Sequence, residues 1–126
     1  MPSNIDFGKA GEEAAVVFLK KHGYKILEHN FKIKLGELDI VAMDGETICF
    51  VEVKTRTSED FGGALGAVSK GKQRKLLQVA LVYLKLRKLL ERKARFDVVA
   101  ITKSGFGSPK IEILKDAFEL SSPYGY

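Results

Sequence analysis

Charged side chains stand inside two strand-like segments that are otherwise apolar. The segment 35–56, LGELDIVAMDGETICFVEVKTR, places Asp39 in the first strand and Glu52 and Lys54 in the second. Carboxylate oxygens are hard ligands that suit Mg²⁺, whose shell is completed by waters and substrate phosphate. A lysine beside such an ion can orient an attacking water or balance charge on a phosphoryl oxygen. The residue types therefore favour metal-dependent hydrolysis of a phosphodiester.

The same residues also fit a role without chemistry. Glu-x-Lys is common on exposed strands, where charged side chains keep a sheet soluble or blunt its edge. Asp39 on the neighbouring strand favours a site, because facing like charges destabilise a hairpin unless a cation neutralises them. On the residues alone, a metal site and a solvated strand face both remain open.

The placement of these side chains depends on a predicted β-hairpin. The segments 37–43 and 47–55 are rich in strand formers, and Asp44-Gly45 between them predicts a tight turn. With Asp44 and Gly45 as a two-residue loop, Asp39 faces Phe50 and Glu37 faces Glu52, and Asp39 is a diagonal neighbour of Glu52. Strand alternation then puts the charged side chains on one face and the apolar ones on the other: Glu37, Asp39, Glu52 and Lys54 against Leu38, Ile40, Val51 and Val53.

The elements around this hairpin predict a single α/β domain over residues 1–126. A mixed sheet flanked by helices is expected, because the helix between the third and fourth strands allows a parallel pair. The predicted order is α-β-β-β-α-β-β: helix 7–23, strand 24–33, strands 37–43 and 47–55, helix 69–93, and strands 94–102 and 110–114. The polar, glycine-rich stretch 56–68 is predicted to be a mobile loop, and 115–126 a C-terminal tail.

Charge is distributed unevenly along the 126 residues. The net charge is +5, but the segment 69–95 holds ten Lys or Arg and one acid, which makes it +9 and the remainder −4. This asymmetry indicates a polyanionic partner. On a helical wheel one sector gathers Lys70, Arg74, Lys85, Lys88, Arg92 and Arg95. Such a stripe can neutralise successive phosphates with little sequence readout, although a solvated basic face is the alternative.

Several classes of protein are excluded. No charged-then-apolar leader and no bilayer-length apolar run are present, which predicts a cytoplasmic protein with no membrane association. The single Cys49 permits no internal disulfide. His22 and His29 lack the spacing of zinc ligands, so both are interpreted as structural or surface residues.

The motifs also carry a resemblance to a known family. In order they are GKAGEEAAVVFLKKHGYKILEHNF, GELDIVAMDG, CFVEVKTR, FG and KQRK, within roughly residues 7–102. This set resembles the YraN-like family of small bacterial predicted endonucleases, relatives of archaeal Holliday-junction resolvases. Asp39 followed thirteen residues later by Glu-Val-Lys is similar to the PD-(D/E)xK signature of restriction-endonuclease-like nucleases. Leu38 replaces the proline of that name, and GGALG (62–66) lacks the family's Pro-x-Glu.

The resemblance implies a restriction-endonuclease-like fold and a set of site residues. Asp39, Glu52 and the carbonyl of Val53 are implied as metal ligands, and Lys54 as the catalytic lysine. Glu12 is implied to point from the first helix toward the same site. Glu37 and Gln73 are weaker candidates, for which a surface strand acid and a helix-surface amide are equally open.

The expected function is therefore a Mg²⁺-dependent endonuclease acting on duplex or branched DNA, with Mn²⁺ as a substitute cofactor. A homodimer would suit a symmetric junction, by analogy only. The alternative is a nucleic-acid-binding module without catalysis. Under either hypothesis, the expected nucleic-acid contacts are Lys70, Lys72, Gln73, Arg74, Lys85, Lys88 and Arg92.

Overall fold

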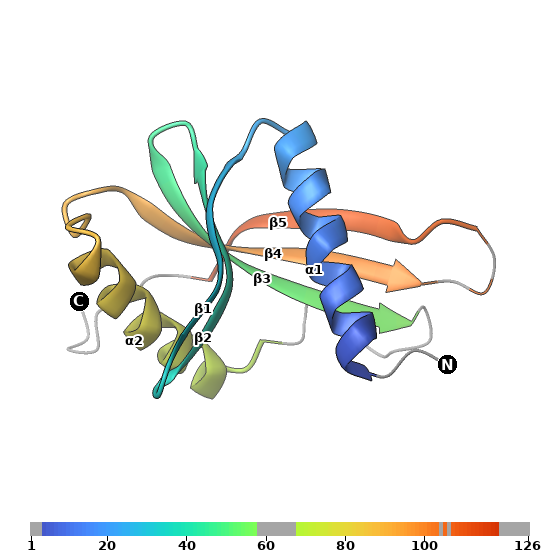
Figure 1. Cartoon of the computed structure of the whole chain (residues 1–126), viewed down its shortest axis with the longest axis horizontal. Coiled ribbons are helices and arrows are strands. Elements are labelled where there is room, and N and C mark those ends of the chain that lie inside the picture. The colour runs from blue at the N-terminus through green and yellow to red at the C-terminus, as the bar shows by residue number, and fades with distance from the viewer. Residues whose placement is uncertain (1–3, 58–67, 104, 106, 119–126) are drawn as a thin grey trace.

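The described residues form a five-stranded sheet flanked by two helices (Figure 1). The computed structural model describes residues 4–57, 68–103, 105 and 107–118. The elements are α1 (Asn4–Lys21), β1 (Lys25–Ile33), β2 (Gly36–Asp44), β3 (Thr47–Thr57), α2 (Lys70–Leu86), β4 (Ala94–Lys103) and β5 (Lys110–Phe118).

The predicted element order and the α/β class are confirmed. The strands lie in the order β1-β2-β3-β4-β5. Neighbours pair antiparallel except β3 and β4, which form the expected parallel pair across the α2 connection. Strand β5 continues to Phe118, past its predicted end at 114. Residues 58–67 of the predicted loop and 119–126 of the predicted tail lie outside the described residues.

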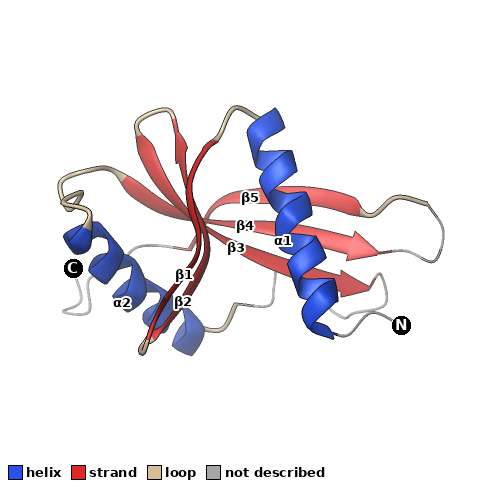
Figure 2. Ribbon diagram, in the orientation of Figure 1, coloured by secondary structure: helices blue, strands red, loops and turns tan. Residues whose placement is uncertain are grey.

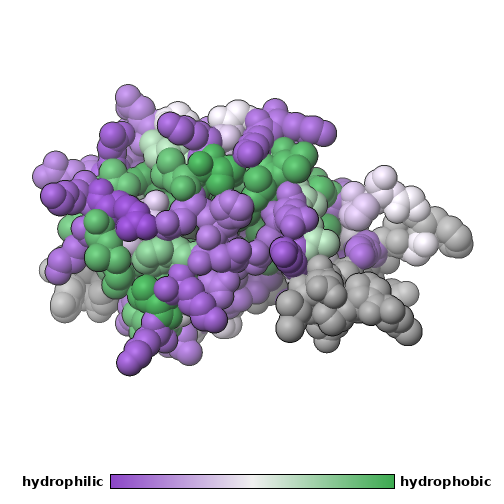
Figure 3. Space-filling view, in the orientation of Figure 1, coloured by the Kyte–Doolittle hydropathy of each residue, from purple (hydrophilic) through white to green (hydrophobic). Residues whose placement is uncertain are grey.

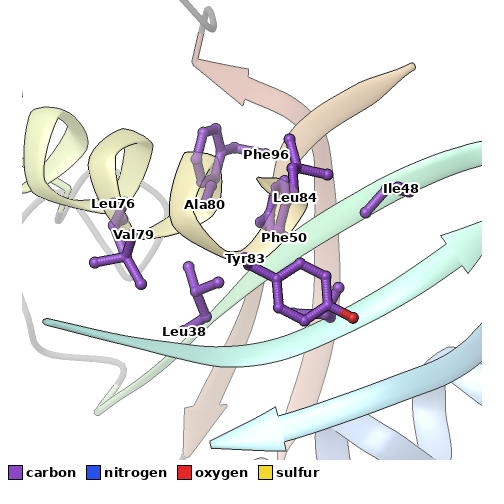
Figure 4. Close-up of a cluster of buried hydrophobic side chains, with 10 residues drawn as sticks. Leu38, Ile48, Phe50, Leu76, Val79, Ala80, Tyr83, Leu84 and Phe96 are labelled. Atoms are coloured by element: carbon purple, nitrogen blue, oxygen red, sulfur yellow. The ribbon is translucent and has the colours of Figure 1, made fainter. Parts of the chain in front are cut away.

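The two helices bury opposite faces of the sheet. Successive residues of β3 alternate between them, since Phe50 packs in the cluster beneath α2 and Val51 in the cluster beneath α1. Figure 4 shows the α2 cluster, where Leu76, Val79 and Tyr83 reach the sheet. The ring of Tyr83 packs edge-on against Phe50 at 6.0 Å between centroids. The apolar alternation that predicted these strands thus fills two separate cores.

The β2–β3 hairpin closes one residue later than predicted. Asp44 pairs with Thr47, so Gly45 and Glu46 form the two-residue loop. Gly45 takes φ +62°. A Gly at the first loop position satisfies the turn alone, whereas Asp44-Gly45 as a type I′ loop would require positive φ at Asp44 too.

This register corrects the predicted pairing. Phe50 pairs with Val41, not with Asp39, and the last pair along the strands is Ile40 with Val51. Continued by one residue, this register sets Asp39 opposite Glu52 rather than on a diagonal, but the strands part before that pair forms. The predicted pairing of Glu37 with Glu52 is wrong for the same reason.

Strand β2 turns over at Asp39, so the predicted division of faces is wrong for Leu38, while Ile40, Val51 and Val53 share a face as predicted. Leu38 packs in the α2 cluster, whereas Ile40 packs in the α1 cluster. Residues two apart on a regular strand share a face, so the backbone rotates between them. Figure 2 shows the result, in which the β1–β2 hairpin turns away from β3, β4 and β5. The sheet forks beside Asp39.

Helix α2 ends at Leu86, seven residues before the predicted end at 93. The Leu89 N–H donates to Leu84 O at 2.7 Å, and Lys88, with φ +58°, donates from its N–H to Lys85 O at 3.2 Å. This is a Schellman motif, in which glycine usually takes the left-handed position that Lys88 takes here. The predicted basic stripe is therefore wrong beyond Lys85.

The surface that carries α1 mixes hydrophilic and apolar residues (Figure 3). Val17 on α1 and Leu27 on β1 are exposed apolar side chains on this fold, which is ordinary for a folded protein. Within the described part of the chain, neither helix has the length and apolar character needed to cross a membrane.

Candidate active site

The fork between β2 and β3 is held open by a side chain. Asp39 Oδ2 accepts a hydrogen bond from the backbone N–H of Val53 at 2.8 Å. That N–H would otherwise pair with the β2 backbone, but the strands have parted here. Since the N–H and C=O of one strand residue point to the same side, the Val53 carbonyl also faces the fork.

A cleft of about 300 Å³ lies at this fork. It is lined by residues of both helices and of β2 and β3: Gly8, Glu12, Asp39, Glu52, Val53, Lys54, Thr55, Arg56 and Lys72. A larger hollow of about 480 Å³, formed by residues 88–92, has one carboxylate, Glu91, in its described lining. Of these two hollows, the smaller one gathers several carboxylates and lysines among the described residues, so it is the candidate site.

Three carboxylates converge on the α1 side of the cleft. Glu12, Glu37 and Asp39 each offer an oxygen within 4.8 Å of the others. Asn30 lies between two of them. With its amide nitrogen turned toward the acids, it donates to Glu12 Oε2 at 2.9 Å and to Glu37 Oε1 at 3.2 Å. Asn30 takes φ +56°, a conformation that asparagine tolerates better than most residues.

The acid cluster shifts the protonation of two of its members. Burial, and then the negative charge of Glu52, raise the pKa of Asp39 to about 7, against the lowering effect of the Val53 N–H. Burial and the charge of Glu37 also raise the pKa of Glu12, despite the hydrogen bond from Asn30. The cluster thus carries more negative charge than its neighbours neutralise, which is the environment that a cation relieves.

Two lysines meet Glu52 on the α2 side of the cleft. Lys72 Nζ lies 3.1 Å from Glu52 Oε1, and Lys54 Nζ lies 3.9 Å from the same oxygen. Burial lowers the pKa of Lys54 to about 8, and the hydrogen bond with Lys72 and the positive charge of Lys72 act in the same direction. The pKa of Lys72 is raised, because hydrogen bonding to Lys54 and the charge of Glu52 outweigh its burial. Lys54 is therefore the lysine that titrates near neutral pH.

Close packing of α1 places Glu12 in the cleft. A Cβ added to Gly11 would lie 2.7 Å from Thr55 Oγ1 on β3, nearer than real Cβ atoms approach. The absence of a side chain at Gly11 therefore lets α1 sit directly on the strand that carries Glu52 and Lys54. Glu12, the next residue, reaches the cleft from there.

The structure gathers the residues predicted for the centre of the site. Asp39, Glu52, Val53, Lys54 and Glu12 all line the one cleft. Glu37, a weaker candidate, joins the acid cluster.

The predicted nucleic-acid contacts are dispersed. Lys70, Arg74 and Lys85 are exposed on α2, while Lys88 and Arg92 are exposed beyond its end. Gln73 does not reach the cleft, because its amide nitrogen donates to Val68 O at 3.0 Å. Arg95, also assigned to the stripe, lies in β4, where its Nε donates to Asp97 Oδ1 at 2.9 Å.

Two residues, Lys72 in the cleft and Asn30 beside its acid cluster, were not predicted in these roles. Lys72 was expected to contact nucleic acid, but it pairs with Glu52. Asn30 carried no periodic signal, since a left-handed residue inside a strand leaves no periodic mark in the sequence. An asparagine in an otherwise strand-like run was the only hint.

The donor set fits a hard divalent cation. Asp39 and Glu52 bring carboxylates from neighbouring strands into one cleft, and the Val53 carbonyl faces the same opening. Oxygen donors of this type are those that Mg²⁺ selects, whereas a soft metal would require sulfur or imidazole. Glu12 extends the set from α1.

The fold and cleft define a small α/β protein with carboxylates and lysines at a forked sheet. The chain belongs to the UPF0102 family: the model described as "Uncharacterised protein family UPF0102" matches residues 11–101. Among its relatives, a UPF0102 protein of Geobacter metallireducens is 51% identical over 118 residues, covering 94% of this chain and 96% of that one. Another, from Syntrophus aciditrophicus, is 46% identical over 121 residues, covering 96% and 94%. A third, from Caldicellulosiruptor saccharolyticus, is 46% identical over 114 residues, covering 90% and 97%.

Proposed function

We propose that this protein is a metal-dependent endonuclease of the PD-(D/E)xK superfamily that hydrolyses phosphodiester bonds of DNA. The observation that carries the proposal is the meeting of Asp39, Glu52 and Lys54 in one cleft at the fork of the sheet. Separate strands contribute the two acids, and burial there raises the pKa of Asp39 to about 7. Perturbed carboxylates converging with a lysine in a cleft favour a functional site over a solvated strand face.

Each residue has a defined part in this proposal. Asp39, Glu52 and the Val53 carbonyl would hold Mg²⁺, which when bound polarises a phosphate and lowers the pKa of water. Lys54 carries an ammonium whose pKa of about 8 lets it hold or release a proton near neutral pH. Its side chain is only 12% exposed, so packing fixes its direction. From that position it can donate to a phosphoryl oxygen or orient the attacking water.

The surface beside the cleft supports a polyanionic substrate. Lys70 and Arg74 are exposed on the first turns of α2, the helix whose Lys72 enters the cleft. These cations can contact phosphates on either side of the bond to be cut without reading bases. The resemblance to junction resolvases extends the proposal to branched DNA and to a homodimer.

A cleavage assay tests the proposal. Labelled duplex, flap, four-way-junction and single-stranded DNA are incubated with Mg²⁺, Mn²⁺ or EDTA. Cutting is expected with either metal and absent in EDTA, and it falls by at least about 100-fold in Asp39→Asn and Lys54→Ala. Glu46→Gln in the β2–β3 loop and Lys25→Ala on β1 remove exposed charges outside the cleft, so they serve as matched controls and should cut normally.

The outcomes separate the two hypotheses. Cutting that persists in EDTA, or in Asp39→Asn, contradicts a metal-dependent site at the fork. Binding without cutting in every metal, unchanged by Asp39→Asn, supports the alternative of a nucleic-acid-binding module.

The role of α2 is tested by salt dependence. The double variant Lys70→Gln/Arg74→Gln should bind DNA more weakly and reduce the slope of log affinity against log salt by about one per charge removed. Lys25→Gln on β1 is the control for net charge alone. An equal slope in both variants would place the DNA contact elsewhere on the molecule.

A further inference from the structure

Lys72, rather than Lys54, is the closest cation to Glu52. The two ammonium groups compete for one oxygen, Glu52 Oε1, at 3.1 Å and 3.9 Å. The Glu52 side chain is only 9% exposed, and a carboxylate this withdrawn from water requires a neighbouring positive charge. In the protein alone, Lys72 supplies that charge.

The two lysines differ in their freedom to leave. Lys54 is 12% exposed and comes from the same strand as Glu52. The Lys72 side chain is 40% exposed and comes from the first turn of α2. A lysine side chain has four flexible carbons, and its ammonium is strongly hydrated. Lys72 can therefore give up its ion pair with Glu52 and become hydrated at a small cost in free energy. Of the two lysines, Lys72 is therefore the one that can move away from Glu52.

The position that Lys72 takes is one that a metal ion also needs. A divalent ion held between Asp39 and Glu52 would draw on the same carboxylate that Lys72 neutralises. Two cations cannot both lie close to one carboxylate without repelling each other, and the doubly charged ion gains more from two acids than the ammonium gains from one.

We propose that Lys72 is a built-in counter-ion of Glu52, which a divalent cation displaces, and that the released ammonium then contacts the phosphate of the substrate. This inference rests on the proposed function, since it assumes a cation site at the fork. It assigns Lys72 two positions, one on Glu52 in the metal-free protein and one toward the nucleic acid when metal is bound. Coupling of this kind would allow productive phosphate binding only after the metal has arrived.

A charge series at position 72 tests the displacement through metal affinity alone. Mn²⁺ is titrated into Lys72→Gln, wild type and Lys72→Arg by calorimetry and by electron paramagnetic resonance, at low salt and without DNA. Lys72→Gln removes the competitor, so the Mn²⁺ Kd is expected to fall about three- to tenfold. Lys72→Arg offers a planar fork that pairs more firmly with a carboxylate, so its Kd should rise above that of wild type.

The matched control is Lys75→Gln, which makes the same charge change at an exposed position of α2. Its Mn²⁺ affinity should stay within about twofold of wild type, because exposed charges further away are screened. Since Lys72→Arg keeps the positive charge, it also guards against a loss of fold in Lys72→Gln.

A second measurement follows the released ammonium to DNA. Salt slopes of duplex binding are compared for wild type and Lys72→Gln, in EDTA and in Ca²⁺. In Ca²⁺ the slope of Lys72→Gln should be smaller by about one, and in EDTA the two slopes should agree. A merely structural Lys72 would give no such dependence on the metal.

The results distinguish this inference from the function on which it rests. If wild type binds no Mn²⁺, the metal site itself is refuted and the displacement falls with it. If wild type binds Mn²⁺ but the affinities do not follow the order Gln, Lys, Arg, only the displacement is overturned. Slopes that differ in EDTA as much as in Ca²⁺ overturn the assignment of Lys72 to the phosphate.

Discussion

Asp97 and Asp39 are two withdrawn carboxylates of one sheet with opposite surroundings. Asp97, 0% exposed, accepts hydrogen bonds from the Tyr24 hydroxyl at 3.2 Å, Arg95 Nε at 2.9 Å and the Asp116 N–H at 2.9 Å. Asp39 accepts one from the Val53 N–H, and the charges that raise its pKa are those of Glu52, Glu12 and Glu37. A buried acid surrounded by donors stabilises a fold, whereas one surrounded by like charges destabilises it when ionised, unless a proton or a cation joins it.

Both regions use a residue in the left-handed conformation, but to different ends. Asp116 in β5 takes φ +53° and turns its N–H to Asp97. Asn30 in β1 takes φ +56° and turns its amide to Glu12 and Glu37, not to Asp39. The left-handed residue in β5 therefore completes the set of hydrogen-bond donors around Asp97, whereas the one in β1 adds no donor to Asp39. The unfilled hydrogen-bonding capacity of the Asp39 carboxylate marks the candidate site.

The largest expected effect is a difference in stability between two matched variants, Asp97→Asn and Asp39→Asn. Asp97→Asn removes the charge that Arg95 faces and turns an amide N–H toward a donor, so unfolding should become easier by about 3 kcal/mol. The melting temperature should fall by roughly 10 °C. Asp39→Asn should instead melt at or above the wild-type temperature in EDTA at pH 8, because it removes a repelling charge. Equal losses in the two variants would remove the distinction between the regions.

The next prediction concerns the pH dependence of stability. The pKa of Asp39, about 7 in the folded chain, exceeds the value of about 3.9 expected when unfolded. Folding therefore takes up a proton between these values, and the resulting stabilisation is lost as pH rises from about 4 to 7. In EDTA, the melting temperature of wild type relative to Asp39→Asn should fall by a few degrees between pH 5 and pH 8.

Divalent metal should reverse that trend. Because metal ligands bind as carboxylates, Mg²⁺ should stabilise wild type more at pH 8 than at pH 5 and should leave Asp39→Asn nearly unchanged. Parallel pH curves for wild type and Asp39→Asn would show that Asp39 is ionised throughout and would contradict its raised pKa.

A smaller effect is expected from Asn30→Asp. Aspartate also tolerates the left-handed conformation, but it replaces the donor between Glu12 and Glu37 with a further negative charge. In EDTA at pH 8 the melting temperature should fall by several degrees, and the loss should shrink on acidification or on adding Mg²⁺. Glu46→Asp, an exposed change in the β2–β3 loop, is the control. An effect that is independent of pH and metal would indicate a backbone role for Asn30.

The smallest effect should come from Tyr24→Phe beside Asp97. The change removes one of several donors to a carboxylate that keeps Arg95 and the Asp116 N–H, so about 1 kcal/mol of unfolding free energy should be lost. Chemical denaturation of both proteins at pH 7 measures it. A loss as large as that of Asp97→Asn would show that the network acts as a single unit rather than as separate bonds.

Local signals explain the parts of the fold that could be predicted. Helix α1 ends at Lys21, two residues before the end of the predicted segment 7–23. Gly23 terminates it as expected, because at φ +87° it takes the left-handed position of a Schellman motif and the Tyr24 N–H reaches Leu19 O at 3.0 Å. Helix α2 ends in the same motif with Lys88 in the glycine position. Residues 87–93 remain good helix formers, so the sequence showed no reason for the helix to stop. Burial of Leu84 with Leu89 against the sheet decided it.

Within the site, residue types and strand parity could be predicted, but convergence could not. Side chains alternate along each strand, and moving the hairpin loop by one residue keeps Asp39 and Glu52 on the same side of the sheet. The prediction that they lie together therefore holds despite the one-residue error in the loop. The pairing of Lys72 with Glu52 depends on where α2 docks. Its docking is set by the Leu38, Phe50 and Tyr83 core, which local patterns do not specify.

The amino-acid sequence by itself determined the elements, their order, the acids and lysine of the fork, and membership of the UPF0102 family. Each of these is written in neighbouring residues or in motif order. Only the tertiary structure decided that β2 turns over at Asp39, that Asn30 aims at Glu12 and Glu37, and that Lys72 rather than Lys54 lies closest to Glu52. The reason is physical: these features depend on side-chain packing and on charge interactions between segments that are far apart along the chain, which local sequence patterns do not specify.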